Sequence, residues 1–206
     1  MIKRYGAFVL LFILFTALSA CYGPKSPLSR AVADDDEQQV RNLLAQGADP
    51  CEKVGEFTAF NWAQGDNREI LRSDAIKTGI YKILLDKAYE RYNTGHPCEN
   101  IIFYAARLGD GEKIRRLIAK GENPNVGQEH WESSPLGIAA YYGNKDAVSA
   151  LVEGGANINQ QIENLEKTRT WATMVGRSST YDRANDALKL LISFKDKQGD
   201  DRRKAQ

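Results

Sequence analysis

Few side chains in this chain of 206 residues could carry out chemistry, because it holds only three cysteines and two histidines. Cys51, His96 and Cys98 are potential zinc ligands, but the sequence offers no convincing fourth ligand. Residues 176–180 are small and polar like a phosphate-binding loop, yet no lysine or preceding strand accompanies them. We therefore expect no metal, no cofactor and no catalytic residues, and we predict that the protein is not an enzyme.

The charge balance argues against nucleic acid as a partner. The chain has 28 Lys and Arg against 27 Asp and Glu, a formal charge of +1. The first twenty residues contribute Lys3, Arg4 and no acid, so the remainder carries +1 − 2 = −1. Proteins that bind nucleic acid present a strongly basic face to the phosphates. The near-neutral balance predicts no nucleic-acid partner.

The N-terminal twenty residues have the three parts of a secretory signal. Lys3 and Arg4 form a basic start, residues 7–15 are an unbroken apolar run, and small residues precede Cys21. The sequence Leu-Ser-Ala-Cys at 18–21 resembles the lipobox of bacterial lipoproteins. This resemblance implies export, attachment of diacylglycerol to the Cys21 sulfur, and cleavage that removes residues 1–20. A plain signal peptide and an N-terminal anchor helix are the alternatives.

The same resemblance implies a location in the bacterial cell envelope. Stable retention needs more than one acyl chain, a condition that a lipidated Cys21 meets. Tyr22 stands where an Asp would retain an enterobacterial lipoprotein at the inner membrane, so we expect the outer membrane, facing the periplasm. Residues 21–25 read as a short tether. In an oxidising compartment Cys51 and Cys98 favour a disulfide over free thiols, and closing that loop would stabilise the fold by about 4 kcal/mol.

The body of the chain repeats a helix-turn-helix pattern. In residues 134–159 a Ser-Pro-Leu opening is followed by the small pair Ala139-Ala140, a turn glycine, an apolar helix face and a closing Gly-Ala-Asn. Residues 100–125 repeat the alanine pair, the turn glycine, the apolar helix face and the closing glycine, and residues 26–50 repeat the Ser-Pro-Leu opening, a small pair (Ala31-Val32), the apolar face and a closing Gly-Ala-Asp. The spacing from Ala105 to Ala139 is 34 residues. These segments resemble ankyrin repeats, whose period is about 33 residues.

The resemblance implies an all-α fold, an α-solenoid of about five ankyrin-like repeats. The predicted domain covers residues 26–194, with a second repeat over 58–88 that a polar insertion at 66–79 interrupts. The last repeat, 168–194, is degenerate and serves as a cap, because terminal repeats must shield an apolar face from water. Within it, the spacing of apolar residues predicts an amphipathic helix over 182–194. Residues 195–206 are almost wholly polar and are expected to form a flexible tail.

A binding surface follows from the ankyrin resemblance, because hairpin tips and the residues after the small pair face the concave side. Aromatic residues there are typical of interaction hot spots, although they could instead pack against neighbouring repeats. The residues that occupy these positions are His96, Pro97, Arg107, Leu108, His130, Trp131, Ser133, Tyr141 and Tyr142.

We therefore expect a monomeric, non-catalytic scaffold that is held at the membrane by lipid and binds a protein partner. One alternative is a periplasmic immunity or inhibitor lipoprotein that neutralises a toxic effector enzyme. Another is an envelope adaptor in stress protection or assembly. An enzyme that uses the insertion or the loop at 176–180 is the remaining class.

Overall fold

The computed structural model describes residues 24–55, 57–64, 78–96, 98–128 and 130–204. The predicted signal segment, Cys21, Pro97 and nearly all of the predicted insertion lie outside these residues. The described part is helical, and its one β-type pairing is the isolated bridge between Val54 and Phe57. None of its helices is both long enough and apolar enough to cross a membrane. The prediction of an all-α fold is confirmed.

The chain divides into two compact units, residues 1–87 and 88–206. The first unit holds α2 (Pro27–Ala33), α3 (Glu37–Ala45) and α4 (Ala59–Ala63). Helix α5 (Thr78–Asn93) begins in the first unit and ends in the second. It therefore extends beyond residue 88, where the second repeat was predicted to end.

Helices of the first unit begin where the sequence supplies caps. The Ser26 hydroxyl accepts a hydrogen bond from the Ser29 amide at 3.1 Å, and Pro27 follows at the first helical position. The Asp36 carboxylate accepts one from the Gln39 amide at 2.9 Å and so caps α3. Helix α2 packs against both α3 and α4. The resulting core buries, among others, Val32, Phe60 and Tyr81.

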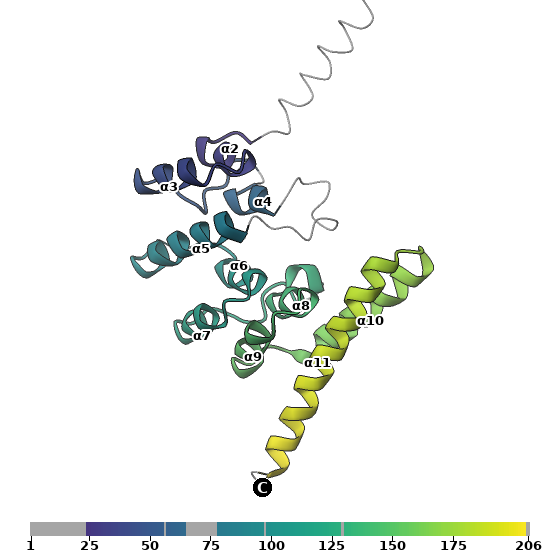
Figure 1. Cartoon of the computed structure of the whole chain (residues 1–206). Helices are drawn as coiled ribbons and strands as arrows, with labels where there is room; N and C mark the ends of the chain where they lie inside the picture. Colours follow the sequence, from purple (N-terminus) through teal and green to yellow (C-terminus); the bar gives the residue numbers. More distant parts are fainter. Residues whose placement is uncertain (1–23, 56, 65–77, 97, 129, 205–206) are drawn as a thin grey trace, which may run out of the picture. The chain divides into compact units, whose positions relative to one another are not determined.

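The second unit contains two complete helix pairs stacked in register (Figure 1). The first pair is α6 (Ile101–Leu108) with α7 (Gly111–Ala119), and the second is α8 (Pro135–Tyr141) with α9 (Lys145–Glu153). Helix α6 packs on α8 and α7 packs on α9, so equivalent helices of successive repeats meet. Both small pairs, Ala105-Ala106 and Ala139-Ala140, are buried, as the ankyrin-like pattern predicts.

The turn between paired helices ties one repeat to the next. Gly109 ends α6 with a φ of +88°, a conformation that suits a residue without a Cβ. The Asn144 side-chain amide, from the following repeat, donates to the carbonyls of Ala106 and Arg107 at 2.9 and 3.0 Å. These bonds cap the last turn of α6, where the Ala106 carbonyl also accepts from the Gly109 amide at 3.2 Å.

The C-terminal part differs from the predicted repeat boundaries. Helix α10 (Ile158–Met174) runs without a break through residue 168, where the last repeat was predicted to begin. It contains no glycine or proline, so nothing in its sequence ends the helix sooner. Helix α11 (Ser178–Lys204) begins before the predicted 182 and continues through most of the segment expected to be a tail. Together α10 and α11 form a long hairpin (Figure 1).

Helix α11 closes the stack. It packs against α10 and also contacts α8 and α9. Four residues of the predicted apolar stripe, Ala184, Ala187, Leu188 and Leu191, are buried, and Phe194 is half-buried. The stripe thus covers the second unit's last helix pair, as predicted for a terminal cap.

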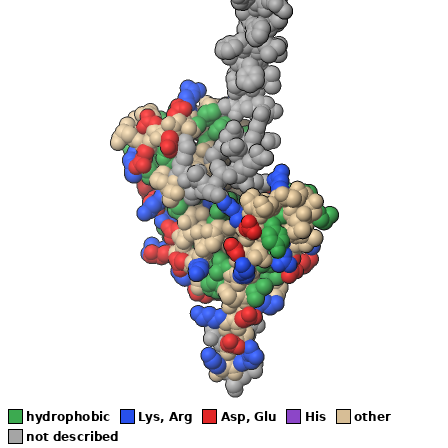
Figure 2. Space-filling view, turned by 45° about the vertical axis from the view of Figure 1, so that its right-hand side comes forward, with side chains coloured by type: hydrophobic (Ala, Val, Ile, Leu, Met, Phe, Trp, Pro, Cys, Tyr) green, Lys and Arg blue, Asp and Glu red, His purple; other side chains and the backbone are tan. Residues whose placement is uncertain are grey.

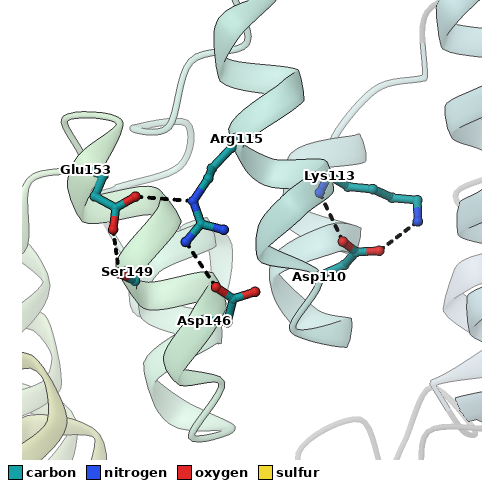
Figure 3. A network of polar contacts seen from close by, with 6 residues as sticks. All are labelled: Asp110, Lys113, Arg115, Asp146, Ser149 and Glu153. Atoms are coloured by element: carbon teal, nitrogen blue, oxygen red, sulfur yellow. Dashed lines mark hydrogen bonds and ion pairs between the residues drawn. The ribbon is translucent and has the colours of Figure 1, made fainter.

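A polar network joins the outer helices α7 and α9 (Figure 3). The Arg115 guanidinium donates to Asp146 at 3.0 Å and to Glu153 at 3.2 Å. The Ser149 hydroxyl donates to the other Glu153 oxygen at 2.6 Å. This hydroxyl, followed by Arg115, lowers the pKa of Glu153 from its ordinary value of 4.5. All three charged groups are exposed, so water and salt screen their attraction.

We predict that Arg115→Ala lowers the free energy of unfolding by about 0.5–1 kcal/mol at pH 7, because it removes two ion pairs between repeats. Because the pKa of Glu153 is lower in the folded protein, its carboxylate stabilises the fold above pH 4.5. That stabilisation is lost as the pH falls through the pKa of the folded state. Urea unfolding should therefore show the two proteins converging as the pH falls below 4.5. Arg116→Ala is the control, since Arg116 pairs with Glu112 within α7. An Arg115→Ala effect that persists in acid, once Glu153 is protonated, would contradict the assignment.

Candidate functional site

The ends of α6 and α8 bring several predicted binding residues together. The guanidinium carbon of Arg107 lies 3.3 Å from the ring centroid of Tyr142. The rings of Tyr142 and Tyr141 meet edge to face, with centroids 5.3 Å apart and an interplanar angle of 77°. On the other side the guanidinium carbon of Arg183, from α11, lies 5.7 Å from the Tyr141 centroid. We call these four residues the tyrosine–arginine cluster.

Members of the cluster differ in exposure. Arg107 is 4% exposed and Tyr141 is 7% exposed, whereas Tyr142 and Arg183 are partly exposed. The sequence left open whether the tyrosines form contact surface or pack against a neighbour. The structure places Tyr141 and Arg107 in the packed layer, so neither presents a free face to a partner. Tyr142 is the tyrosine of the cluster that offers surface.

The cluster suits recognition of another protein. Arginine over an aromatic face gains roughly 0.5–2 kcal/mol from the ring quadrupole, and the stacking fixes the ring in place. A ring held this way has little conformational entropy left to lose on binding. Tyrosine also combines apolar area with a hydroxyl that can donate or accept. The arrangement can therefore bind a side chain or a loop, but it provides no nucleophile and no catalytic base.

The remaining predicted contacts lie elsewhere. His130 and Ser133 are exposed on the hairpin before α8, where the Ser133 amide donates to the His130 carbonyl at 3.1 Å. Trp131 begins the short 3-10 helix η1 (Trp131–Ser133), but its side chain, like Pro97, lies outside the described residues. Leu108 is half-buried, and His96 is exposed with its ring nitrogen 3.4 Å from the Thr94 hydroxyl.

The cysteines and acids do not form a metal centre in the described part of the chain. Cys51 and Cys98 are both disulfide-bonded, a state in which neither offers a thiolate to zinc. Across the ranges that the structure describes, no group of three or more His, Cys, Asp or Glu side chains is placed to hold a metal ion.

Sequence reasoning missed two residues that build the cluster. Asn144 holds the end of α6, and Arg183 reaches Tyr141 from a helix 42 positions further along the chain. Arg183 lies within the predicted helix 182–194, but nothing in the neighbouring sequence shows which earlier residue it contacts.

Figure 2 shows acidic and basic side chains interspersed over the visible surface rather than gathered into one basic face.

We predict that replacing Tyr141 destabilises the fold much more than replacing Tyr142. Tyr141→Ala should lower the free energy of unfolding by about 3–5 kcal/mol, because it empties a buried ring site. Tyr142→Ala should cost roughly 1 kcal/mol through the lost arginine contact. Tyr142→Phe is the matched control and should be nearly neutral, since the ring under Arg107 remains. Chemical denaturation of the four proteins decides this, and equal losses for Tyr141→Ala and Tyr142→Ala would refute the assignment.

Comparisons with known proteins agree with the stacked helix pairs. The family profile "Ankyrin repeats (3 copies)" matches residues 73–162 and 102–201. Among curated proteins, the chain is 31% identical over 146 residues to human histone-lysine N-methyltransferase EHMT1, and 33% identical over 98 residues to the mouse protein. These matches cover 70% and 47% of this chain but 10% and 7% of the relatives, so they carry no implication of methyl transfer.

A solved ankyrin repeat domain from Acinetobacter baumannii AYE is 21% identical, with a TM-score of 0.33 and coverage of 81% of this chain and 96% of that one. Ankyrin repeats generally mediate protein–protein interaction and are typically non-catalytic. The profile match spans well over half of the sequence and coincides with the observed pairs α6–α7 and α8–α9. The chain belongs to the ankyrin-repeat family.

Proposed function

We propose that this protein is a non-catalytic scaffold that binds one protein partner at the tyrosine–arginine cluster and at the hairpin that leads into α8. The observation that carries the proposal is the Arg107–Tyr142 stack, which fixes a partly exposed aromatic ring at the end of α8. His130 and Ser133 are exposed on the segment that leads into the same helix, and Trp131 stands between them in sequence. An immobilised tyrosine at one end of α8, with a tryptophan in the segment before its other end, is a composition expected of an interaction hot spot.

We further propose that the scaffold works at the bacterial envelope, tethered by lipid on Cys21. The support is the Leu-Ser-Ala-Cys sequence at 18–21 behind a basic and then apolar leader. Export also suits a disulfide between Cys51 and Cys98, because such bonds persist in oxidising compartments. Closing that loop of 98 − 51 = 47 residues would offset the weakening of the repeat that carries the insertion.

The immunity or inhibitor role is the specific form of this proposal. An inhibitor needs a rigid, preformed surface and no chemistry of its own. The Tyr142 ring, held under Arg107, supplies such a surface. It would capture a single effector tightly, whereas an envelope adaptor would capture several unrelated proteins.

The decisive experiment places a photo-crosslinking residue in the full chain at position 142, and a matched one at the exposed Glu112 on α7. We expect one discrete adduct from position 142 and none from position 112. In affinity capture without a crosslinker, Trp131→Ala with Tyr142→Ala should lose the partner. Tyr142→Ala alone should shift the thermal midpoint by only a few degrees, since it costs roughly 1 kcal/mol.

Equal labelling from both positions, or unchanged capture by the double variant, would remove the cluster from the binding site. Mass spectrometry of the same captured chain determines whether Cys21 is acylated. An acylated Cys21 supports the anchor, whereas an unmodified Cys21 ends that part of the proposal and leaves the binding site standing.

A further inference from the structure

The tip of the C-terminal hairpin exposes an unusual amount of apolar surface. Five large apolar side chains are exposed in the described part of the chain, and four of them lie within eleven residues at this turn. These four are Trp171 (47% exposed), Met174 (79%), Val175 (49%) and Tyr181 (38%). The fifth, Ile192, lies further along α11. Such clustering marks an interaction surface, whereas single exposed apolar residues need no explanation.

Backbone hydrogen bonds close the C-terminal end of α10 at this tip. The amides of Val175, Gly176 and Arg177 donate to carbonyls of the last turn of α10 at 3.1, 3.3 and 2.9 Å. Gly176 adopts a φ of +68°, which permits this closure. A satisfied backbone matters because every unpaired polar group that leaves water raises the cost of entering an apolar phase.

Two threonines of α10 beside the apolar residues have hydroxyls that are satisfied in the same way. The hydroxyl of Thr170 donates to the Glu166 carbonyl at 2.9 Å, and that of Thr173 donates to the Arg169 carbonyl at 3.0 Å. Both hydroxyls are thus turned back onto the helix, and their desolvation costs less than that of free hydroxyls.

The tip itself is basic. Residues 169–181 contain Arg169 and Arg177 and no acid, a balance of +2. The whole chain carries +1, so the other residues together carry +1 − 2 = −1. The guanidinium carbon of Arg177 lies 5.3 Å from the Trp171 ring centroid, which places a cation beside the largest exposed apolar side chain.

We propose that this tip, residues 169–181, docks into the headgroup region of an anionic phospholipid membrane. Trp and Tyr favour the boundary between water and lipid, where the ring is apolar and its polar group stays wet. Basic side chains add attraction to anionic headgroups, roughly fivefold in binding for each residue close to the surface. The tip of a two-helix hairpin is a projecting turn, which suits shallow insertion into a lipid surface (Figure 1). The docking does not require lipid at Cys21.

The test uses the thioether of Met174 as a local probe, since Met1 is the other methionine of the sequence. The full chain is treated with hydrogen peroxide alone, with phosphatidylcholine vesicles, and with vesicles containing phosphatidylglycerol. Peptide mass spectrometry then gives the rate of Met174 oxidation. We expect the rate of Met174 oxidation to fall about fivefold or more with the anionic vesicles and to stay unchanged with phosphatidylcholine vesicles, because only the anionic surface draws the sulfur out of water. A methionine peptide in the same suspensions reports peroxide activity.

Two matched variants locate the effect. Trp171→Ser should restore fast oxidation on anionic vesicles, whereas Ile192→Ser, an exposed apolar residue elsewhere on the same hairpin, should leave the protection intact. Unchanged oxidation on anionic vesicles would overturn the proposal. Equal protection of Met174 by both vesicle types would also overturn it. So would protection that rises with protein concentration in the absence of vesicles, because it would show that a second copy of the chain covers the tip.

Discussion

The fold depends on the fact that no single helix pair can bury its own apolar stripe. Each repeat places its small pair and its apolar second helix against the next repeat, so burial is shared between neighbours. In the second unit α6 meets α8 and α7 meets α9, and α11 then covers α8 and α9. The buried face of α11 is therefore what allows that stack to end without exposing its core.

The same stacking builds the candidate site. Asn144 fixes the end of α6, Arg107 is held there against Tyr142, and α11 brings Arg183 to Tyr141. Because Arg107 and Tyr141 are buried, they cannot contact a partner, but both of them hold the Tyr142 ring in place. A rigid, partly exposed ring is better suited to binding than a mobile, fully exposed one, because less entropy is lost when a partner arrives. In the proposed site, stability and recognition would use the same residues.

The sequence predicts the parts of this structure that local chemistry determines. Ser26 and Asp36 begin helices because their side chains cap free amides, and the alanine pairs are buried because only small residues let helices approach closely. What it cannot predict depends on distant packing. The approach of Arg183 to Tyr141 arises only once α11 folds back on the stack, and Arg107 meets the Tyr142 ring only once α8 packs on α6.

Adjacent residues of α11 offer the most direct measurement of this account. Leu191 is fully buried on the capping face, and Ile192 is 43% exposed beside it. If the cap completes the core, Leu191→Ala should lower the free energy of unfolding by about 2–5 kcal/mol in denaturant titration, and Ile192→Ala by less than about 1 kcal/mol. Equal small losses for both substitutions would show that α11 does not close the stack, and would contradict the account.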